Sequence, residues 1–410
     1  MSQSRGSGGA AHARGTRGVP PRIDREEKAQ RTSPPAGKGA GRAAFGAPGR
    51  QIALSPPLPS RIAPLLLDWS VTHGRHDLPW QREPTPYRVW VSEVMLQQTQ
   101  VATVIPYYRR FVARFPDVAA LASATLDEVL HAWTGLGYYA RARNLHRAAQ
   151  LVMSEHGGCL PDRIDALQSL PGVGRSTAGA VLALSCGQRH PILDGNARRV
   201  LARVFAVEGD PSSKETLSAL WDLADACTPH DRAAAYAQAI MDLGAGVCLR
   251  SRPRCDACPL SGACLACATG RQHELPSPRR RAYRPQRAAC ALVIRDAAGA
   301  LLLQQRPVEG LWGGLWGFPQ FDSEAEAVAW LAACLPTAVF ESSPLPTQHH
   351  AFTHYDLTLH PRAVRLEASQ PAIAACAWYD TSNPARLGLT RAVTEVIRAL
   401  CQIDTNSTLR

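Results

Sequence analysis

The sequence predicts two folded domains of different class, an all-α domain followed by an α+β domain. From about residue 61 to 268, apolar residues recur at spacings of three and four, which is the periodicity of helices, as in the run Leu126, Val129, Leu130 and Trp133. Residues 271–287 then contain six Arg and three Pro, as expected of an exposed basic linker. After them, two short apolar runs flank a glycine-containing turn at 296–299, which is the pattern of a β-hairpin.

Composition sets the expected boundaries of these parts. Residues 1–50 contain ten Gly, five Pro, ten basic and three acidic residues, with hardly any large apolar side chain. Such a segment cannot bury enough surface to offset its ordering entropy, so we expect a disordered basic tail over 1–55. The helical domain is then expected at 56–270, the linker at 271–287 and the α+β domain at 288–405.

Charge and cysteine content restrict the class of protein. The formal net charge of +11 suits a polyanionic partner. No apolar run approaches the roughly 18 residues of a membrane span, and no secretory signal is recognisable. The chain has 12 cysteines, too few for a disulfide scaffold, but five of them lie within 248–267. In a chain that is not exported, such crowding favours metal over disulfides. The absence of a span and of a signal predicts a cytoplasmic protein with no membrane partner.

A glycine-containing turn between two helical patterns suits DNA. Residues 170–174 (LPGVG) lead directly into a helical run that starts near Ser176, so a hairpin of two helices is expected over 167–182. Gly172 and Gly174 allow a tight turn with bare N–H groups pointing outward, and at the start of the following helix these donors suit a phosphate. One interpretation is an ordinary corner between helices. The other is a helix-hairpin-helix, which binds the DNA backbone independently of sequence.

A carboxylate follows this hairpin. Asp194 stands between the apolar pair Ile192-Leu193 and a glycine, twenty residues after Gly174. Taken alone, it is explained equally well as a helix N-cap. A hairpin followed by such an aspartate, however, resembles the helix-hairpin-helix DNA glycosylase superfamily.

Two further segments narrow the resemblance to adenine DNA glycosylases of the MutY type. They are residues 90–101 (WVSEVMLQQTQV) and 135–144 (GLGYYARARN). The resemblance runs from about residue 63 to 267 and resumes in the C-terminal domain. It implies that Glu93 is a general acid and that Asp194 stabilises the sugar. It further implies that DNA or the substrate base is contacted by Gln98, Thr99, Tyr138, Gly172, Gly174, Ser176 and Gln238.

These implied roles agree with the chemistry of the residue types. Adenine leaves poorly as an anion, so cleavage of its N-glycosidic bond needs a protonated base, and the apolar neighbours of Glu93 would keep a carboxylic acid protonated near neutral pH. The sugar left behind resembles an oxocarbenium ion and needs an anion, such as Asp194. Adenine must first leave the base stack, and Gln98 and Tyr138 resemble residues that fill the stack. The alternative for Tyr138 is a buried core position, but its place in a Gly-Leu-Gly turn favours an exposed side chain. The amide of Gln238 suits the edge of adenine.

The cysteine-rich loop at 248–264 resembles the family's [4Fe-4S] loop. Six, two and five residues separate its four cysteines, which are Cys248, Cys255, Cys258 and Cys264. A structural zinc site typically uses two close pairs, and only one such pair is present here. The spacing also differs from the ferredoxin-type run, so it is the match to the family's loop that favours the cluster over zinc. Cys267 lies outside the pattern. The three arginines of the loop are either a solvated charge run or a phosphate-contacting element.

Ser176 bears on the reaction type. Bifunctional relatives of the endonuclease III type carry a lysine at this position, whose amine attacks the sugar and forms a Schiff base. A serine cannot form a Schiff base. The sequence therefore favours a monofunctional glycosylase.

The C-terminal domain resembles a Nudix fold at residues 310–319 (GLWGGLWGFP). A Nudix hydrolase would next carry a helix with several carboxylates for Mg²⁺, but residues 323–330 (SEAEAVAW) lack that set. The resemblance therefore implies a reader of 8-oxoguanine without hydrolase activity.

A lesion-contacting loop is implied at Phe352-Thr353-His354. The family usually has Ser where Thr353 stands, so the hydroxyl is retained and a methyl is added. The neighbouring His349 and His350 are interpreted as ordinary loop residues.

The sequence as a whole predicts a monomeric enzyme with a [4Fe-4S] cluster that acts on double-stranded DNA. It would remove adenine mispaired with 8-oxoguanine or guanine, in the cytoplasm at the nucleoid. One alternative is a bifunctional glycosylase and lyase like endonuclease III, which Ser176 and the C-terminal domain disfavour. The other is a DNA-binding repair scaffold without catalysis, which Glu93 and Asp194 disfavour.

Overall fold

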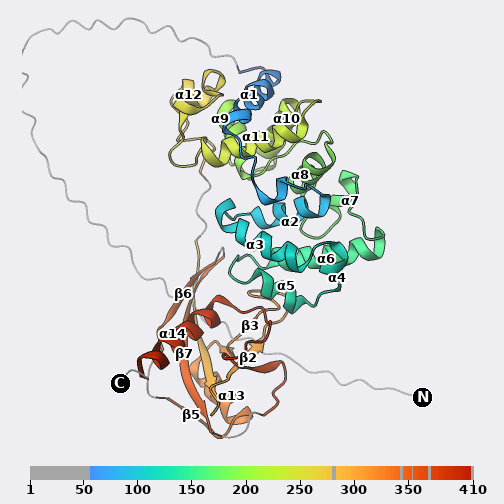
Figure 1. Ribbon diagram of the computed structural model, residues 1–410. Coiled ribbons are helices and arrows are strands. Elements are labelled where there is room, and N and C mark those ends of the chain that lie inside the picture. The colour runs from blue at the N-terminus through green and yellow to red at the C-terminus, as the bar shows by residue number, and fades with distance from the viewer. Residues whose placement is uncertain (1–55, 279–282, 342–344, 353, 368–370, 408–410) are drawn as a thin grey trace, which may run out of the picture. The chain divides into compact units, whose positions relative to one another are not determined.

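The computed structural model describes residues 56–278, 283–341, 345–352, 354–367 and 371–407 (Figure 1). The predicted tail at 1–55 and Thr353 lie outside these residues. As predicted, a helical domain is followed by an α+β domain.

The helical domain consists of α-helices and short 3₁₀ turns. Its helices are α1 (Ile62–His73), α2 (Pro86–Leu96), α3 (Val101–Arg114), α4 (Val118–Ser123), α5 (Leu126–Trp133), α6 (Ala140–Glu155), α7 (Ile164–Gln168), α8 (Arg175–Cys186), α9 (Gly195–Val204), α10 (Lys214–Cys227), α11 (Ala233–Gly246) and α12 (Leu265–Ala268). The 3₁₀ turns are η1 (Pro59–Arg61), η2 (Pro79–Gln81), η3 (Cys255–Ala257) and η4 (Ser261–Ala263). None of the helices that the structure describes has both the length and the apolar character of a membrane span.

Side chains at the helix N-termini explain where several helices begin. Thr85, just before Pro86, accepts a hydrogen bond from the backbone of Arg88 and starts α2. Thr125 and Glu128 form a reciprocal capping box at α5. These side chains satisfy backbone N–H groups that have no partner within the helix, and each such cap is typically worth about 1 kcal/mol.

Two hydrophobic cores meet at α8. Helices α2 to α6 bury large side chains such as Trp90, Phe111 and Trp133 in one core, and α1, α9, α10 and α11 form the other. Val181 of α8 belongs to the first core and Ala183 to the second. The helix therefore has apolar contacts on two sides and separates the two groups of helices.

The stretch predicted as a linker is only partly a linker. Leu275 is buried, and its carbonyl accepts a hydrogen bond from Nε of Arg203 at 2.8 Å. The first strand begins at Gln286, inside the predicted range of 271–287. The buried side chain of Leu275 and the hydrogen bond to its carbonyl thus attach the beginning of this stretch to the helical domain.

The C-terminal domain has a mixed sheet. Its elements are β1 (Gln286–Arg295), β2 (Leu301–Gln305), β3 (Trp316–Gly317), β4 (Gln320–Phe321), α13 (Glu324–Cys334), β5 (Ala338–Phe340), β6 (Gln348–Ala351), β7 (Asp356–Leu366), β8 (Cys376–Tyr379) and α14 (Arg391–Ser407). The central order is β3-β2-β1-β7-β5, with β1 and β7 parallel and β1 and β2 antiparallel. The β1–β2 pair confirms the hairpin expected from the sequence.

The residues of β1 alternate between the two faces of the sheet. Leu292 packs in one core with Leu331 of α13, whereas Val293 packs in another with Val393 of α14. This alternation follows from the two-residue period of a strand. A helix therefore covers each face of the sheet.

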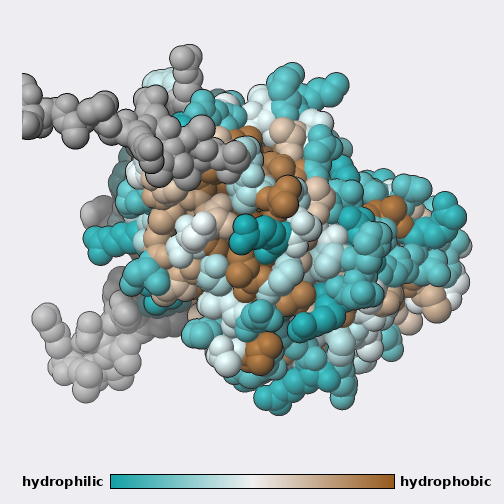
Figure 2. Space-filling model, turned by 90° about the horizontal axis from the view of Figure 1, so that it is seen from above, coloured by the Kyte–Doolittle hydropathy of each residue, from teal (hydrophilic) through white to brown (hydrophobic). Residues whose placement is uncertain are grey.

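Apolar residues also reach the surface of the helical domain. Figure 2 shows a face on which hydrophobic residues are interspersed among hydrophilic ones. On α1, Leu65 and Val71 are exposed.

Candidate active site

A cavity of about 940 Å³ lies between the two groups of helices. Several of the residues singled out from the sequence line it, namely Glu93, Gln98, Thr99, Ser176, Asp194 and Gln238. They come from the C-terminal half of α2 and the residues that follow, and from α8, the start of α9 and α11. The fold thus brings together residues up to about 145 positions apart in the sequence.

Glu93 projects from α2, between residues that belong to the first core. Val94 and Met95 beside it are buried, and so is Val91. Desolvation by this burial, followed by the charge of Asp194, raises the pKa of Glu93 to about 8. A carboxyl group in this environment is protonated at neutral pH and can act as an acid.

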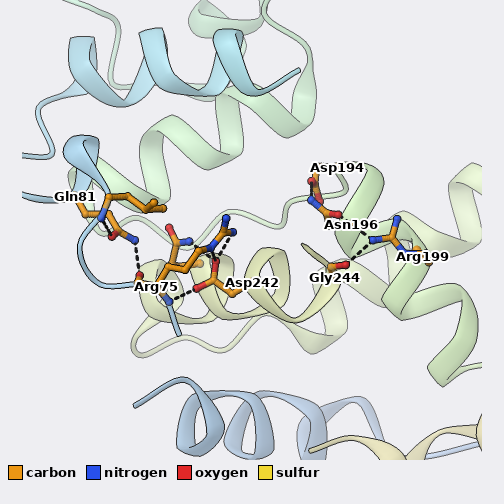
Figure 3. Close-up of polar contacts among 9 residues, drawn as sticks. Arg75, Gln81, Asp194, Asn196, Arg199, Asp242 and Gly244 are labelled. Carbon is orange, nitrogen blue, oxygen red and sulfur yellow. Dashed lines mark hydrogen bonds and ion pairs between the residues drawn. The ribbon is translucent and has the colours of Figure 1, made fainter. Parts of the chain in front are cut away.

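Asp194 is the N-cap of α9 and has the opposite environment. Its Oδ1 accepts a hydrogen bond from the backbone N–H of Ala197 at 2.7 Å, and its Oδ2 accepts one from Nδ2 of Asn196 at 3.0 Å (Figure 3). The positive end of the helix dipole lies at the same place. Both carboxylate oxygens therefore have a donor, and the side chain is held at the start of the helix. The N-cap interpretation and the site interpretation are therefore both compatible with this geometry.

Arg199 connects this carboxylate to the cysteine-rich loop. Its Nη2 donates to Oδ1 of Asn196 at 2.9 Å and to the carbonyl of Gly244 at 2.6 Å, as Figure 3 shows. Its Nε donates to the carbonyl of Cys248 at 2.7 Å. The first turn of α9, the end of α11 and the start of the loop are thus held by one guanidinium.

An ion pair between Arg75 and the buried Asp242 orients Gln238. Asp242 accepts hydrogen bonds from the backbone N–H and from Nε of Arg75, both at 2.8 Å, and its side chain is 3% exposed (Figure 3). Nε2 of Gln238 donates to Oδ1 of the same carboxylate at 2.8 Å. Gln81 in turn accepts from Leu78 and donates to the carbonyl of Arg75. The amide of Gln238 is therefore fixed with its nitrogen toward Asp242.

The sequence interpretation did not single out Arg75, Asp242, Asn196 or Arg199. A signal for Asp242 was present, because it is a carboxylate within an apolar helical run, one turn after Gln238. A charge at such a position is normally paired. The identity of its partner, 167 residues away, required the fold.

The glycines of the hairpin meet two different demands. Gly172 has a φ of +78°, and a Cβ there would lie 2.9 Å from Cβ of Asn144. Both backbone conformation and space therefore require glycine. Gly174 caps α8, and nothing lies within 4 Å of a Cβ placed there. The start of α8 is thus open to a ligand, as a phosphate-binding helix N-terminus requires.

Gln98 and Tyr138 both adopt left-handed backbone conformations, with φ of 58° and 49°. This conformation is uncommon outside glycine and costs of the order of 1 kcal/mol or more, so the surrounding structure must impose it. The side chain of Tyr138 is 52% exposed, which excludes the core position considered for it.

One buried arginine binds residues that flank both Gln98 and Tyr138. Arg141 is 8% exposed, and its Nη1 donates to the carbonyls of Met95 at 2.7 Å and Gln97 at 2.6 Å. Its Nη2 donates to Oγ1 of Thr99 at 3.2 Å and to the carbonyl of Gly137 at 3.0 Å. The guanidinium thus joins the end of α2 to the loop that carries Tyr138.

The cysteine-rich loop forms a second cavity. The cavity is lined by apolar side chains and by Cys248, Cys255, Cys258, Cys264 and Cys267. In the part of the chain that the structure describes, no group of three or more Cys, His, Asp or Glu side chains has the geometry to hold a metal ion. Arg203 is buried, and its Nη1 donates to the sulfur of Cys248 at 3.2 Å. Thiols around one cavity and a cation beside a sulfur suit a thiolate-bound group.

The C-terminal domain places the predicted lesion loop next to an aromatic cluster. The ring of Trp312 lies 5.4 Å from the rings of both His350 and Phe352. Phe352 contacts Tyr355 at 5.4 Å between ring centres, and its N–H donates to the carbonyl of Tyr355 at 2.9 Å. His354 is exposed. Phe352 at the start of the loop is therefore anchored, whereas His354 at its end is exposed.

The interpretation of the two histidines as ordinary loop residues is wrong. Both lie in β6, where His349 is exposed and His350 is 7% exposed. Burial lowers the pKa of His350, so it is neutral within the aromatic cluster. The alternation of a strand explains why one ring is buried and the other is not.

Glu324 lies in α13, the helix in which a Nudix hydrolase would carry its carboxylates. Its side chain forms an ion pair with Arg362.

Comparison with known proteins gives two family matches. Residues 91–226 match the HhH-GPD superfamily base excision DNA repair protein, and residues 290–399 match the NUDIX domain. Adenine DNA glycosylase of Buchnera aphidicola (subspecies Acyrthosiphon pisum) is 35% identical over 340 residues, which cover 81% of this chain and 95% of that protein. Adenine DNA glycosylase of Homo sapiens is 39% identical over 367 residues, which cover 75% and 67%. Among solved structures, a thermostable thymine-DNA glycosylase is 27% identical with a TM-score of 0.47, over 52% of this chain and 97% of that one.

Proposed function

Because the chain belongs to the adenine DNA glycosylase family of base excision repair, we propose that it removes adenine mispaired with 8-oxoguanine or guanine. The reaction is hydrolysis of the N-glycosidic bond in the cavity between α2, α8, α9 and α11. One observation carries the assignment of the site. Two carboxylates line the same cavity in opposite environments, Glu93 desolvated and Asp194 stabilised by donors.

Glu93 donates the proton that adenine needs in order to leave. With its pKa raised to about 8, the carboxyl group still carries this proton at neutral pH. Proton donation from a positioned acid is typically worth about 10²–10⁴-fold in rate. Once the base has left, the resulting carboxylate accepts a proton from the attacking water.

Asp194 faces the sugar cation that forms as the bond breaks. The donors from Ala197 and Asn196 keep its carboxylate in place. It stabilises the cation electrostatically or through a short-lived covalent bond, as carboxylates do in retaining glycosidases.

Gln238 holds the edge of the flipped adenine. Its nitrogen donates to Asp242, so its amide oxygen is the atom that accepts from the exocyclic amine of the base. The ion pair of Asp242 with Arg75 fixes this orientation before the substrate arrives. The hairpin at 167–182 binds a phosphate at the start of α8, and Gln98, Thr99 and Tyr138 contact the opened stack.

A single-turnover excision assay on a duplex with adenine opposite 8-oxoguanine tests this function. Glu93→Gln and Asp194→Asn should each lower the excision rate by 100-fold or more, which is about 3 kcal/mol in the barrier, while mispair affinity is retained. Glu128→Gln and Asp225→Asn are matched controls on the surface and should react at the wild-type rate. Residual excision within tenfold of wild type in both site variants would mean that the chain uses other groups. Tight mispair binding without any excision by the wild type would favour a repair scaffold.

Ser176 makes the enzyme monofunctional, because it offers no amine to the sugar. Borohydride should therefore trap little covalent complex, and strand cleavage should require added base or heat. Trapping as efficient as that of a lyase would favour the bifunctional alternative.

The cysteine-rich loop holds a [4Fe-4S] cluster through Cys248, Cys255, Cys258 and Cys264. When bound, the cluster braces the loop that carries the exposed Arg250, Arg252 and Arg254, which then contact DNA phosphates. The purified protein should be yellow-brown with about four iron and four sulfide per chain. Cys258→Ser should lose colour, iron and DNA affinity, whereas Cys227→Ser, at a buried cysteine away from the loop, should keep them. Zinc without sulfide would overturn this assignment.

The C-terminal domain reads 8-oxoguanine through the loop Phe352-Thr353-His354. His354→Ala should reduce the preference for 8-oxoguanine over guanine opposite adenine by about tenfold, since one or two lost hydrogen bonds suffice. His349→Ala, at a nearby exposed histidine, should leave the preference unchanged. The measurement is the ratio of the excision rates on the two mispairs, taken for both variants at one salt concentration. An unchanged ratio in His354→Ala would contradict this role of the loop.

A further inference from the structure

The segment that leads to Asp194 lies along α8. Ile192 and Leu193 are 3% and 2% exposed. Gly179 of α8 allows the closest approach, because a Cβ at this position would lie 2.7 Å from the carbonyl oxygen of Pro191. A backbone this deep in the domain must find partners for its N–H groups.

Ser176 supplies one of these partners. Its Oγ accepts a hydrogen bond from the backbone N–H of Leu193 at 3.0 Å. Ser176 and Gly179 are three positions apart, so they lie on the same side of α8. The segment is therefore attached to the helix at two points, and the second is the residue immediately before Asp194.

The same helix also sets the distance between the two carboxylates. α8 packs against α2, which carries Glu93. Nε2 of Gln97, at the end of α2, donates to Oγ1 of Thr177 at 3.4 Å. A shift of the Leu193 backbone away from α8 would thus move Asp194 relative to Glu93 and to the sugar between them.

We propose that Ser176 is a positioning residue for Asp194, acting through the N–H of Leu193. The inference rests on the role proposed for Asp194. Ser176 then contributes to catalysis by holding Asp194 in place, and not only by offering no amine to the sugar. A misplacement of about 1 Å at a reacting centre can cost up to about 100-fold in rate, so one hydrogen bond at this point matters for catalysis.

The test compares Ser176→Ala, which removes the acceptor, with Ser176→Thr, which keeps the hydroxyl. Ser185→Ala is the matched control, because Ser185 lies on the same helix and donates to the carbonyl of Val181 in the previous turn. Three quantities are measured for each variant: the single-turnover excision rate at saturating enzyme, the affinity for the mispair, and amide hydrogen exchange of the peptide that contains Leu193.

Ser176→Ala should lower the excision rate about tenfold, with mispair affinity within about twofold of wild type and faster exchange at Leu193. Ser176→Thr should recover most of the rate, and Ser185→Ala should match wild type. An excision rate within twofold of wild type for Ser176→Ala would overturn the proposal. Two other outcomes would also overturn it. One is a folded Ser176→Thr variant whose excision rate is as low as that of Ser176→Ala, and the other is a loss of mispair affinity that accounts for the whole decrease in rate.

The role of Asp194 is checked separately with Asp194→Asn. If that variant excises adenine at the wild-type rate, the proposed function of Asp194 fails whatever Ser176 does. If it is inactive while Ser176→Ala is fully active, only the positioning role is wrong.

Discussion

Replacing Glu93 by glutamine should stabilise the protein, by an amount that grows with pH. The folded protein holds the pKa of this carboxyl at about 8, above its ordinary value of 4.5, chiefly because the group is desolvated. Between these two pH values the folded chain binds a proton that the unfolded chain has released. The free energy of unfolding of the wild type therefore falls as pH rises. Glutamine has no proton to lose, so its variant lacks this slope.

The magnitude follows from the two pKa values. Each unit of pKa difference corresponds to about 1.4 kcal/mol, which gives an upper limit near 5 kcal/mol well above pH 8. Between pH 5.5 and 8, the stability of Glu93→Gln relative to wild type should rise by about 3 kcal/mol. The change with pH is the useful quantity, because differences in packing between the two side chains cancel from it.

Urea unfolding of both proteins at four pH values between 5.5 and 8 measures this quantity. Glu128→Gln is the control, since Glu128 caps α5 and a backbone hydrogen bond lowers its pKa. That variant should be less stable than wild type, and its deficit should not shrink as pH rises. If the advantage of Glu93→Gln is the same at every pH, the carboxyl is not held protonated and the acid role loses its physical basis.

Three further predictions follow from the site. The excision rate should fall above about pH 8, by up to tenfold per pH unit, as Glu93 ionises, and a rate that stays flat to pH 9.5 would contradict this. Gly179→Ala should destabilise the protein by about 1–3 kcal/mol, although alanine normally favours a helix, because its Cβ would lie 2.7 Å from the oxygen of Pro191, and thermal unfolding gives the sign. Arg203→Met removes the donor to the sulfur of Cys248 and should lower the iron content of the purified protein, as metal analysis would show.

The periodicity of the sequence was sufficient to predict the order and class of the domains. The run at 126–133 became α5, and the apolar runs around residue 297 became the β1–β2 pair. Local rules work for such elements because capping, periodicity and turn residues act within a few positions of one another. The sequence also indicated Glu93 and Asp194, through motifs that surround them.

The partners of these residues could not be predicted in the same way. Arg75 and Asp242 are 167 positions apart, and nothing in either neighbourhood identifies the other. Arg141 stood within a motif but had no role until its carbonyl acceptors were known. The burial of His350 depended on the register of β6 against β7, which places it opposite Leu357. Long-range pairing and register are properties of the fold and not of a local pattern.

The buried guanidinium of Arg141 has a consequence for how DNA is opened. Gln98 and Tyr138 are held rigidly relative to each other. The carbonyls of Gln97 and Gly137 and the hydroxyl of Thr99, which lie beside them in the sequence, all accept hydrogen bonds from this one guanidinium. Burial lowers the pKa of Arg141 to about 10, so it remains charged at neutral pH and keeps these hydrogen bonds. If these two side chains enter a base stack as proposed, the protein does not bend to reduce the strain. The DNA must then take up the distortion, and these side chains will open base pairs that unstack readily before others.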